Sequence, residues 1–476
     1  MRKQDYLLQL IQSLSPNEKR YFKLFCQTQT GGKHYLKLFN YLEEQTSYNP
    51  QAVAKALGIT SAKLAHEKEY LQDVLLRNLR MFHENNYVES NLMGQYLQAD
   101  LMYRKGLSTY AVSIAKKILV KAVLYERFGL ALGLTRLLSH SYAHLGIYDE
   151  MEKINEEEQR IIDQQVEYLS IIHLRDRFMS PVMNRTGYET LKDVAEHPLF
   201  KADPATFKSW HSRHCWNEMC QFYYTYVERN PAKALEHAQN LAKMFSKAPH
   251  FRSILPTGYF NAYANICVRQ YNMGNYREAL TAVNQLLERS SQKVPSVSPE
   301  LMDRFHRFGL TTKMTLLSLL HQFNEACVFG EQVLKVLDTI KHGEQITFLF
   351  DYALSLFHTG DYDGCLKNLN RLIDMKTKER VDVQLYARLL FVMLQLQLKN
   401  YQLIPYQVKS IKAWKKRMKI DAEHCDELLG WFDKLGKAGM QQQWNTGFAK
   451  FKEHLQEGHI KELNTELALS KWKTRK

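Results

Sequence analysis

Apolar residues recur along most of this chain at intervals of three and four positions, which is the spacing of amphipathic helices. In the first ninety residues they form three such groups: Tyr21, Phe22, Leu24 and Phe25; Tyr35, Leu38, Phe39 and Leu42; and Leu64, Leu71, Leu75, Leu79 and Phe82. Ser15-Pro16-Asn17-Glu18 before the first group predicts a capped helix start. Proline is absent from 51–180 and 300–404, as expected of long helices. The pattern predicts an all-α protein.

A second regularity has a longer period. The segment 263–288 predicts one helix, a turn at Gly274-Asn275-Tyr276-Arg277-Glu278-Ala279, and a second helix. Similar turns recur at intervals of 39 to 47 residues, and we mark each copy by the residue equivalent to Tyr276. These turn markers are Ser108, Tyr148, Tyr188, Pro231, Tyr276, Phe323, Tyr362 and Tyr401. A repeated helical hairpin is therefore predicted.

Segment 263–288 resembles a tetratricopeptide repeat (TPR), with Gly274, Tyr276 and Ala279 at that family's turn and packing positions. The resemblance implies a right-handed solenoid of antiparallel helical hairpins. We expect about eight TPR-like hairpins over 91–411, a small helical cap domain at 1–90, and basic helices with a tail at 412–476. The period is longer than the family's 34 residues, so other helical-hairpin solenoids stay open.

The resemblance also implies a binding groove, because the first helix of each pair lines the inner face of such a solenoid. Carried over copy by copy, the groove positions are Tyr96, Asp100, Tyr103, Arg136, His140, Met219, Tyr223, Tyr226, Asn261, Ala264, Val268 and Tyr271. Polar and aromatic side chains suit capture of a peptide. The alternative is that long helices bury several of them in the core.

Charge adds a second candidate surface. The chain has 64 Lys and Arg against 50 Asp and Glu, a net charge of +14. From Lys399 to Lys476 the balance is 16 − 9 = +7. Within that region Lys409, Lys412, Lys416 and Lys419 share one helical face, which predicts either a polyanion-binding stripe or a solvated outer face. Residues 471–476 are expected to be a mobile basic end.

A possible DNA contact lies nearer the N-terminus. Ala54-Lys55-Ala56-Leu57-Gly58-Ile59-Thr60, followed by Leu64, resembles the turn of a helix-turn-helix, which implies a recognition helix from near Ser61. Glu67 and two further carboxylates, Glu69 and Asp73, would face phosphates, so a packing hairpin is the favoured interpretation.

The remaining residues provide little evidence for chemistry. The seven cysteines form no spaced framework, and His211, Cys215 and Cys220 do not make a zinc set on a regular helix. No phosphate-binding or nucleophile-elbow motif appears, and Thr30-Gly31-Gly32-Lys33 is expected to be a loop. We expect no metal, no cofactor and no enzymatic activity. The absence of a signal peptide or membrane span favours a cytoplasmic protein.

Taken together, these patterns predict a protein-interaction scaffold that binds a protein or peptide segment in its groove. The alternative is a partner-sensing transcriptional regulator that contacts nucleic acid through the N-terminal helices or the basic C-terminal helix. A subunit that forms a homodimer through the solenoid is a third possibility. The sequence does not identify the partner.

Overall fold

The computed structural model describes residues 6–28, 34–184, 191–292, 294, 297–375, 377–441, 443–453 and 467–472. Over these residues the chain consists of α-helices with a few short 3₁₀ turns and contains no β-strand. The all-α prediction is confirmed. None of the described helices combines the length and apolar character needed to cross a bilayer.

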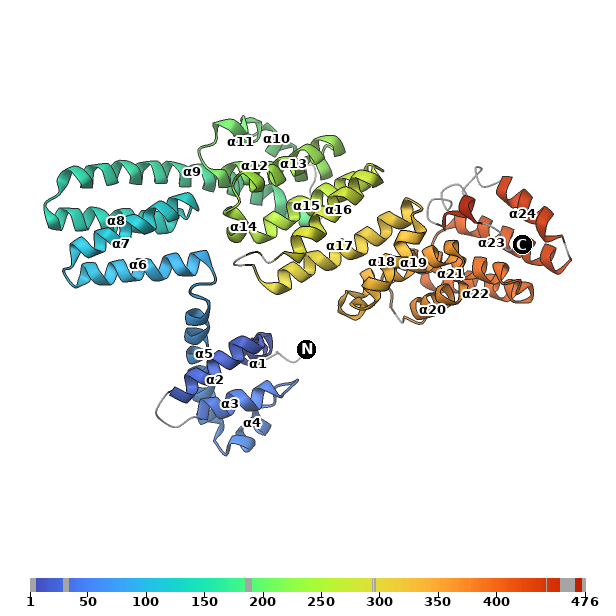
Figure 1. The fold of residues 1–476 in the computed structure, drawn as a ribbon, viewed down its shortest axis with the longest axis horizontal. Coiled ribbons are helices and arrows are strands. Elements are labelled where there is room, and N and C mark those ends of the chain that lie inside the picture. Colours follow the sequence, from blue (N-terminus) through green and yellow to red (C-terminus); the bar gives the residue numbers. More distant parts are fainter. Residues whose placement is uncertain are drawn as a thin grey trace.

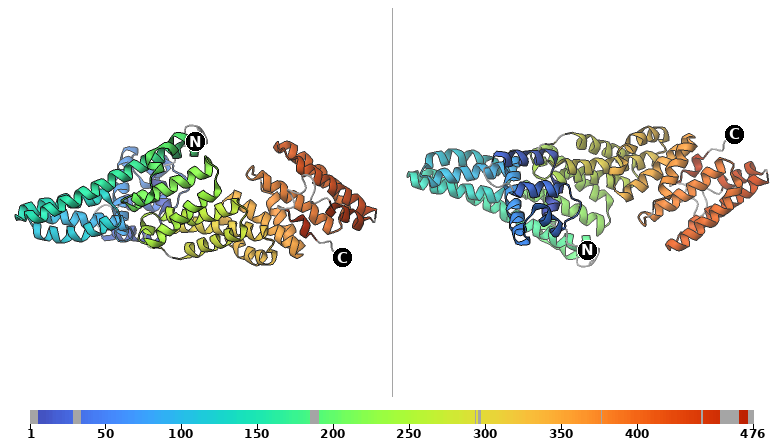
Figure 2. Two further views of the ribbon diagram at one scale, coloured as in Figure 1. Left: turned by 90° about the horizontal axis from the view of Figure 1, so that it is seen from above. Right: turned by 90° about the horizontal axis from the view of Figure 1, so that it is seen from below.

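The first five helices form a packed group at one side of an elongated molecule (Figure 1, Figure 2). They are α1 (Tyr6–Ser13), α2 (Pro16–Thr28), α3 (His34–Glu43), α4 (Pro50–Leu57) and α5 (Ser61–His83). Before α2, the amide of Ser15 donates to Glu18 Oε2 over 2.6 Å, and the amide of Glu18 donates to Ser15 Oγ over 3.3 Å. This reciprocal cap is the helix start predicted from the sequence.

From Val88 onward the helices follow one another in pairs along the long axis (Figure 1). The pairs are α6 (Val88–Arg104) with α7 (Ser108–Leu124), α8 (Phe128–Leu145) with α9 (Tyr148–Asn184), α12 (Trp210–Tyr226) with α13 (Pro231–Lys247), α15 (Pro256–Asn272) with α16 (Tyr276–Ser291), α17 (Pro299–Leu319) with α18 (Phe323–Leu334), α19 (His342–Thr359) with α20 (Tyr362–Ile373), and α21 (Val381–Gln397) with α22 (Ile404–Met418). The handedness of the stack stays a prediction.

Shorter elements connect or follow these pairs. They are α10 (Lys192–Glu196), α11 (Pro198–Lys201), α14 (Phe251–Ile254), α23 (Glu423–Met440), α24 (Trp444–Glu453), and the 3₁₀ turns η2 (Pro204–Thr206), η3 (Leu337–Thr339), η4 (Tyr401–Leu403) and η6 (Leu469–Lys471).

Each described turn marker is the first residue of the second helical element of its pair. These residues are Ser108, Tyr148, Pro231, Tyr276, Phe323, Tyr362 and Tyr401, where the last begins the 3₁₀ turn that precedes α22. Gly274 and Gly360 adopt left-handed backbone angles (φ 78° and 92°) just before their markers, which a residue with a Cβ rarely does. The small residues at the crossing, Ala279 and Cys365, are completely buried. The turn glycines and the small crossing residues are therefore placed as predicted, but the second helix begins at Tyr276, inside the segment 274–279 that was predicted as a turn.

The copy marked by Tyr188 falls outside the described residues. Before it, α9 runs for 37 residues with Pro181 inside it, so the second pair has a much longer second helix than the others. This long helix packs against α12 of the next pair.

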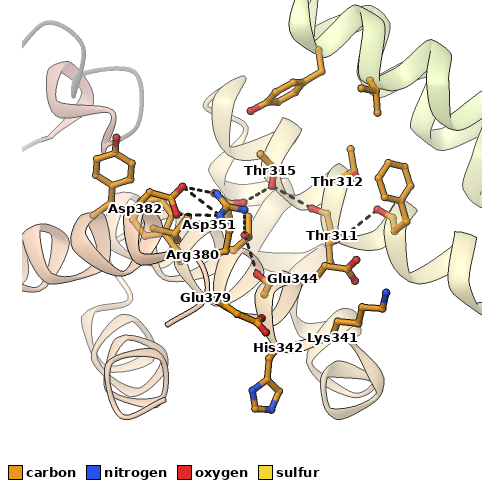
Figure 3. Close-up of a pocket in the computed structure, with 18 of the residues that line it drawn as sticks. Thr311, Thr312, Thr315, Lys341, His342, Glu344, Asp351, Glu379, Arg380 and Asp382 are labelled. Atoms are coloured by element: carbon orange, nitrogen blue, oxygen red, sulfur yellow. Dashed lines mark hydrogen bonds and ion pairs between the residues drawn. The ribbon is translucent and has the colours of Figure 1, made fainter. Parts of the chain in front are cut away.

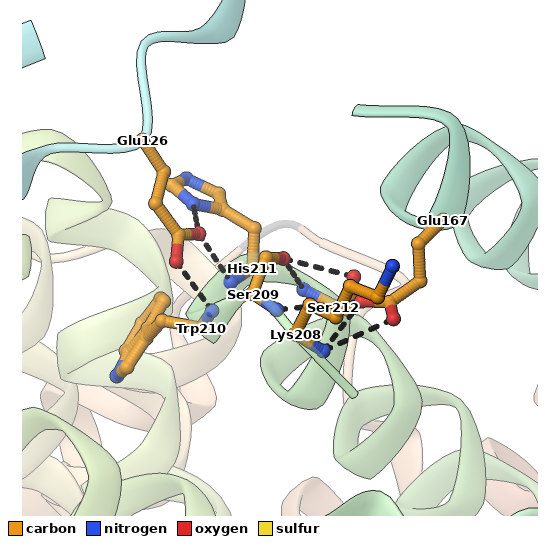
Figure 4. Close-up of polar contacts among 7 residues, drawn as sticks. All are labelled: Glu126, Glu167, Lys208, Ser209, Trp210, His211 and Ser212. Carbon is orange, nitrogen blue, oxygen red and sulfur yellow. Dashed lines mark hydrogen bonds and ion pairs between the residues drawn. The ribbon is translucent and has the colours of Figure 1, made fainter. Parts of the chain in front are cut away.

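A carboxylate joins parts of the solenoid that are far apart in sequence (Figure 4). Glu126 lies in the short connection between α7 and α8 with a left-handed backbone (φ 48°). Its carboxylate accepts bonds from the amides of Trp210 (2.5 Å) and His211 (2.8 Å), and lies 2.7 Å from His211 Nδ1. Glu167 on α9 accepts the amide of Lys208 at 3.0 Å. Two carboxylates thus hold the N-terminal end of α12, where negative charge is favourable.

The C-terminal end of the described chain returns to the core. Trp472 is 1% exposed, its Nε1 donates to Gln397 Oε1 over 3.0 Å, and its ring lies 4.9 Å from that of Phe448. His358 Nε2 lies 3.2 Å from the carbonyl oxygen of Leu467. The predicted mobile end is therefore wrong for residues 471 and 472, because a buried indole with a bonded N–H stabilises the segment strongly. Residues 473–476 lie outside the described part.

Candidate functional site

A cavity of about 950 Å³ opens between four helices in the C-terminal half of the solenoid (Figure 3). Its walls come from α15, α17, α19 and α21, which are the first helices of four successive pairs, and from the residues that precede α19 and α21. The lining comprises Val268, Tyr271, Asn272, Phe308, Thr311, Thr312, Thr315, Lys341, His342, Gly343, Glu344, Thr347, Phe350, Asp351, Glu379, Arg380, Asp382, Val383 and Tyr386. First helices therefore form this surface, as the family resemblance implies.

The repeat explains why these side chains meet. Counting fifteen residues back from each turn marker gives Asn261, Phe308, Thr347 and Tyr386 in the last four pairs. Three of these four line the cavity. Equivalent positions of stacked hairpins lie side by side, so one position of the repeat supplies a row of side chains.

Arg380 organises one end of the cavity (Figure 3). Its Nη2 donates to Asp382 Oδ2 over 2.9 Å, and its Nη1 donates to Thr347 Oγ1 over 2.8 Å. Partial burial raises the pKa of Asp382, but the hydrogen bonds and charge of Arg380 outweigh burial, so this pKa lies below its usual value. The hydrogen bonds that Arg380 donates to Asp382 raise the pKa of Arg380. Arg380 and Asp382 are therefore a charged pair that fixes the start of α21.

A second polar pair forms the floor. Thr315 Oγ1 on α17 donates to Asp351 Oδ2 on α19 over 2.5 Å, and Asp351 is only 6% exposed. Thr311, one turn earlier on α17, bonds back to carbonyl oxygens of its own helix. The floor thus carries acceptor oxygens held in place by neighbouring hydroxyl groups.

The rim is charged and the walls are partly aromatic. Lys341 and His342 at the start of α19 are exposed, and Glu344 lies half-buried one turn further. A Cβ added to Gly343 would lie 3.0 Å from Glu379 Oε2, so the missing side chain leaves room for that carboxylate. The cavity therefore offers hydrogen-bond donors, acceptors and ring faces within one concave surface.

The groove residues predicted from the sequence lie on four different helices. Tyr96, Asp100 and Tyr103 are on α6, Arg136 and His140 on α8, Met219, Tyr223 and Tyr226 on α12, and Asn261, Ala264, Val268 and Tyr271 on α15. Of these, only Val268 and Tyr271 line the cavity described above. Met219 and Ala264 are buried in the core.

Several of the others are engaged within the chain. Asp100 Oδ2 accepts from Arg104 Nε over 2.5 Å, and Arg136 Nε lies 2.8 Å from Glu158 Oε1. The ring of Tyr223 is half-buried and lies 4.9 Å from the ring of Phe200. His140 and Tyr226 are exposed. A binding role for the residues of α6, α8 and α12 stays a prediction.

Sequence reasoning missed most of the cavity. It carried the groove positions over to the pairs up to α15, whereas the lining continues through α17, α19 and α21. The turn markers Phe323, Tyr362 and Tyr401 contained the signal, since the same offset from each marker identifies Phe308, Thr347 and Tyr386. Arg380 and Lys341 precede their helices and follow no repeat rule.

The structure also shows where the lysine stripe and the helix-turn-helix-like segment lie. Lys409, Lys412, Lys416 and Lys419 are exposed at and just beyond α22. The helix-turn-helix-like segment forms α4, a left-handed Gly58 and α5, with Thr60 Oγ1 accepting the amide of Lys63 over 3.3 Å.

The histidine and cysteine side chains that were considered as zinc ligands contact other groups of the protein instead. His211 faces Glu126, and burial raises the pKa of the Cys215 thiol to about 12. No cluster of three potential ligands occurs in the described part of the chain. The predicted loop at 30–33 lies in a segment that the structure does not describe.

Comparisons with known proteins leave the family open. No protein-family model matches the sequence, and no curated protein matches it. Among solved structures, the chain is similar to a Signal Transduction ATPase with Numerous Domains (STAND) protein with a tetratricopeptide repeat sensor from Pyrococcus horikoshii, at 11% identity and a TM-score of 0.35. The match covers 75% of this chain and 52% of that one, so this chain spans about half the length of that protein.

Proposed function

We propose that the chain is a non-enzymatic interaction scaffold, which binds an extended segment of a partner protein in the α15–α21 cavity. The observation that carries this proposal is the cavity of about 950 Å³, built from the first helices of four successive pairs. Stacked first helices make an elongated surface, and an elongated surface suits a chain better than a compact ligand.

The chemistry of the lining supports a peptide. Glu344 offers acceptors to backbone N–H groups, while Lys341 offers donors to carbonyl oxygens. The rings of Phe308 and Tyr386 provide faces for apolar side chains. The cavity volume of about 950 Å³ is large enough for several side chains of an extended segment.

Photocrosslinking tests the location of the partner. A photoreactive phenylalanine analogue placed at Thr312 inside the cavity should crosslink one protein in native cells, identified by mass spectrometry, with or without nuclease. The same analogue at Lys121, exposed on α7, is the control and should not crosslink that protein.

A titration then tests the cavity itself. The crosslinked segment, made as a peptide, should bind the purified chain in calorimetry. Thr312→Trp fills the cavity and should weaken binding at least about tenfold, whereas Thr281→Trp on the exposed face of α16 should not change it. Equal binding by both variants, or crosslinks that disappear with nuclease, would rule out the peptide-binding proposal.

A second candidate function is a partner-sensing regulator that contacts duplex DNA through the N-terminal helices. The observation in its favour is the α4–α5 turn, from which Lys63 and His66 project into solvent at the start of α5. Salt-sensitive duplex binding that Lys63→Glu abolishes would favour this function. Exposed Glu69 and Asp73 on the same helix count against it, because they repel phosphates.

A further inference from the structure

The helix α22 carries a positively charged surface that the proposed scaffold function does not use. Between Lys399 and Ile420 there are seven Lys or Arg residues and no Asp or Glu. They are Lys399, Lys409, Lys412, Lys415, Lys416, Arg417 and Lys419. A run of this length without any acidic residue concentrates positive potential on one helix.

The packing of α22 against the core leaves this charged surface exposed to solvent. Ile404, Val408, Ile411 and Trp414 bury the opposite face of α22 in the C-terminal core. Because its apolar face is covered, α22 cannot bind a membrane as an amphipathic helix does. The charged face is therefore held rigidly in place.

The lysines on this face are not neutralised. Among the described residues, Lys409, Lys412, Lys416 and Lys419 have no carboxylate within ion-pair distance, whereas Lys415 on the flank pairs with Asp426 at 2.6 Å. The free ammonium groups can exchange counterions for phosphates without breaking an existing pair.

An aromatic side chain lies beside the lysines. Tyr406 is 76% exposed and lies one turn before Lys409, on the solvent side of the same helix. Exposed rings flanked by cations stack on nucleic-acid bases, and this combination of a basic track with an aromatic ring is typical of surfaces that bind single strands. The ring distinguishes this surface from a simple basic patch.

We propose that the surface formed by Tyr406, Lys409, Lys412 and Lys416 binds single-stranded nucleic acid. The lysines contact successive phosphates, and Tyr406 stacks on a base. A single strand exposes its base faces, whereas a duplex covers them, so the ring favours the single-stranded form.

Fluorescence anisotropy with the full chain and a labelled oligouridylate tests this proposal. Between 50 and 200 mM salt, the slope of log K against log salt should be roughly −2 for three phosphate contacts, at about −0.7 per contact. Lys409→Gln/Lys412→Gln/Lys416→Gln should reduce the slope by about 2. Tyr406→Ala should weaken binding about 5- to 150-fold and leave the slope unchanged, as expected for loss of one stacked base.

A matched variant controls for net charge. Lys117→Gln/Lys121→Gln/Lys243→Gln removes three exposed lysines from α7 and α13, lowers the net charge by the same amount, and should leave binding unchanged. Circular dichroism should show that all variants keep their helix content. Thr312→Trp should also bind normally, which separates this surface from the cavity.

Several results would overturn the proposal. No binding by the unmodified chain at 50 mM salt would do so, and so would equal losses in the two triple variants. Equal affinity for polyglutamate or anionic vesicles, together with no effect of Tyr406→Ala, would show that only charge matters there. Tighter binding to a duplex of the same length would also contradict it.

Discussion

Replacing Glu126 with glutamine should loosen the N-terminal end of α12 from the α7–α8 connection. Glutamine has nearly the same shape, and it leaves the left-handed backbone at this position unchanged. It removes the negative charge that accepts the amides of Trp210 and His211 (Figure 4). Its amide oxygen can accept only on one side, and its NH₂ group then faces a second donor.

The magnitude follows from burial and charge. The Glu126 side chain is 13% exposed and that of His211 is 6% exposed, so water replaces the lost bonds poorly. A hydrogen bond to a charged group contributes about 1.5–3 kcal/mol net, and an anion at a helix N-terminus adds about 0.3–1 kcal/mol. Allowing for the one bond that glutamine keeps, we expect a loss of about 2 kcal/mol, or roughly 30-fold in the local opening equilibrium.

Hydrogen exchange measured by mass spectrometry is the suitable assay. A long repeat protein does not unfold in one step, so a single melting temperature would average over several units. Local opening is resolved by peptide instead. Peptides that cover residues 208–216 should exchange roughly 30-fold faster in the variant, whereas peptides from α19 and α21 should keep their rates.

Glu228→Gln is the control for this experiment. Glu228 pairs with Lys233 at 3.3 Å on the surface, and exposed pairs contribute less than about 1 kcal/mol. This variant should leave exchange in α12 nearly unchanged. Unchanged exchange at 208–216 in Glu126→Gln, or a uniform increase along the whole chain, would refute the assigned role of Glu126.

Three further predictions concern stability. Trp472→Ala should destabilise the C-terminal core by about 3–5 kcal/mol, seen as faster hydrogen exchange in peptides from α23 and α24, because Trp472 is fully buried. Gly330→Ala should lower the stability of the fold by about 1–3 kcal/mol, since the new Cβ would lie 2.3 Å from the Tyr352 ring. At Gly430 a Cβ would meet open space, so Gly430→Ala should stabilise α23 by up to about 1 kcal/mol. Burial first, and then the charge of His321, lower the pKa of His358 to about 4 despite its bond to Leu467. As the pH falls, the unfolded state therefore takes up the proton before the folded state does, and stability should fall by about 3 kcal/mol from pH 6.5 to 4. This loss of stability should be smaller in His358→Gln, which has no imidazole to protonate.

The helices and turns were predictable from the sequence because they depend on contacts between residues a few positions apart. Ser15 and Glu18 cap a helix through contacts three residues apart, so the motif is complete within one turn of chain. Gly274 and Gly360 mark helix ends, because their left-handed angles depend on the residue type itself. The candidate cavity was predictable only in part: Val268 and Tyr271 follow the repeat, whereas Arg380 precedes its helix and depends on contacts with Thr347 and Asp382.

The sequence by itself therefore determined the helical class and the hairpin period, since both depend on neighbours along the chain. Tertiary structure alone decided that Glu126 holds a helix 84 residues away and that Trp472 packs beside Gln397. It also decided which first helices enclose the cavity. Those outcomes depend on how hairpins stack, and small differences in helix length and crossing angle accumulate from one pair to the next.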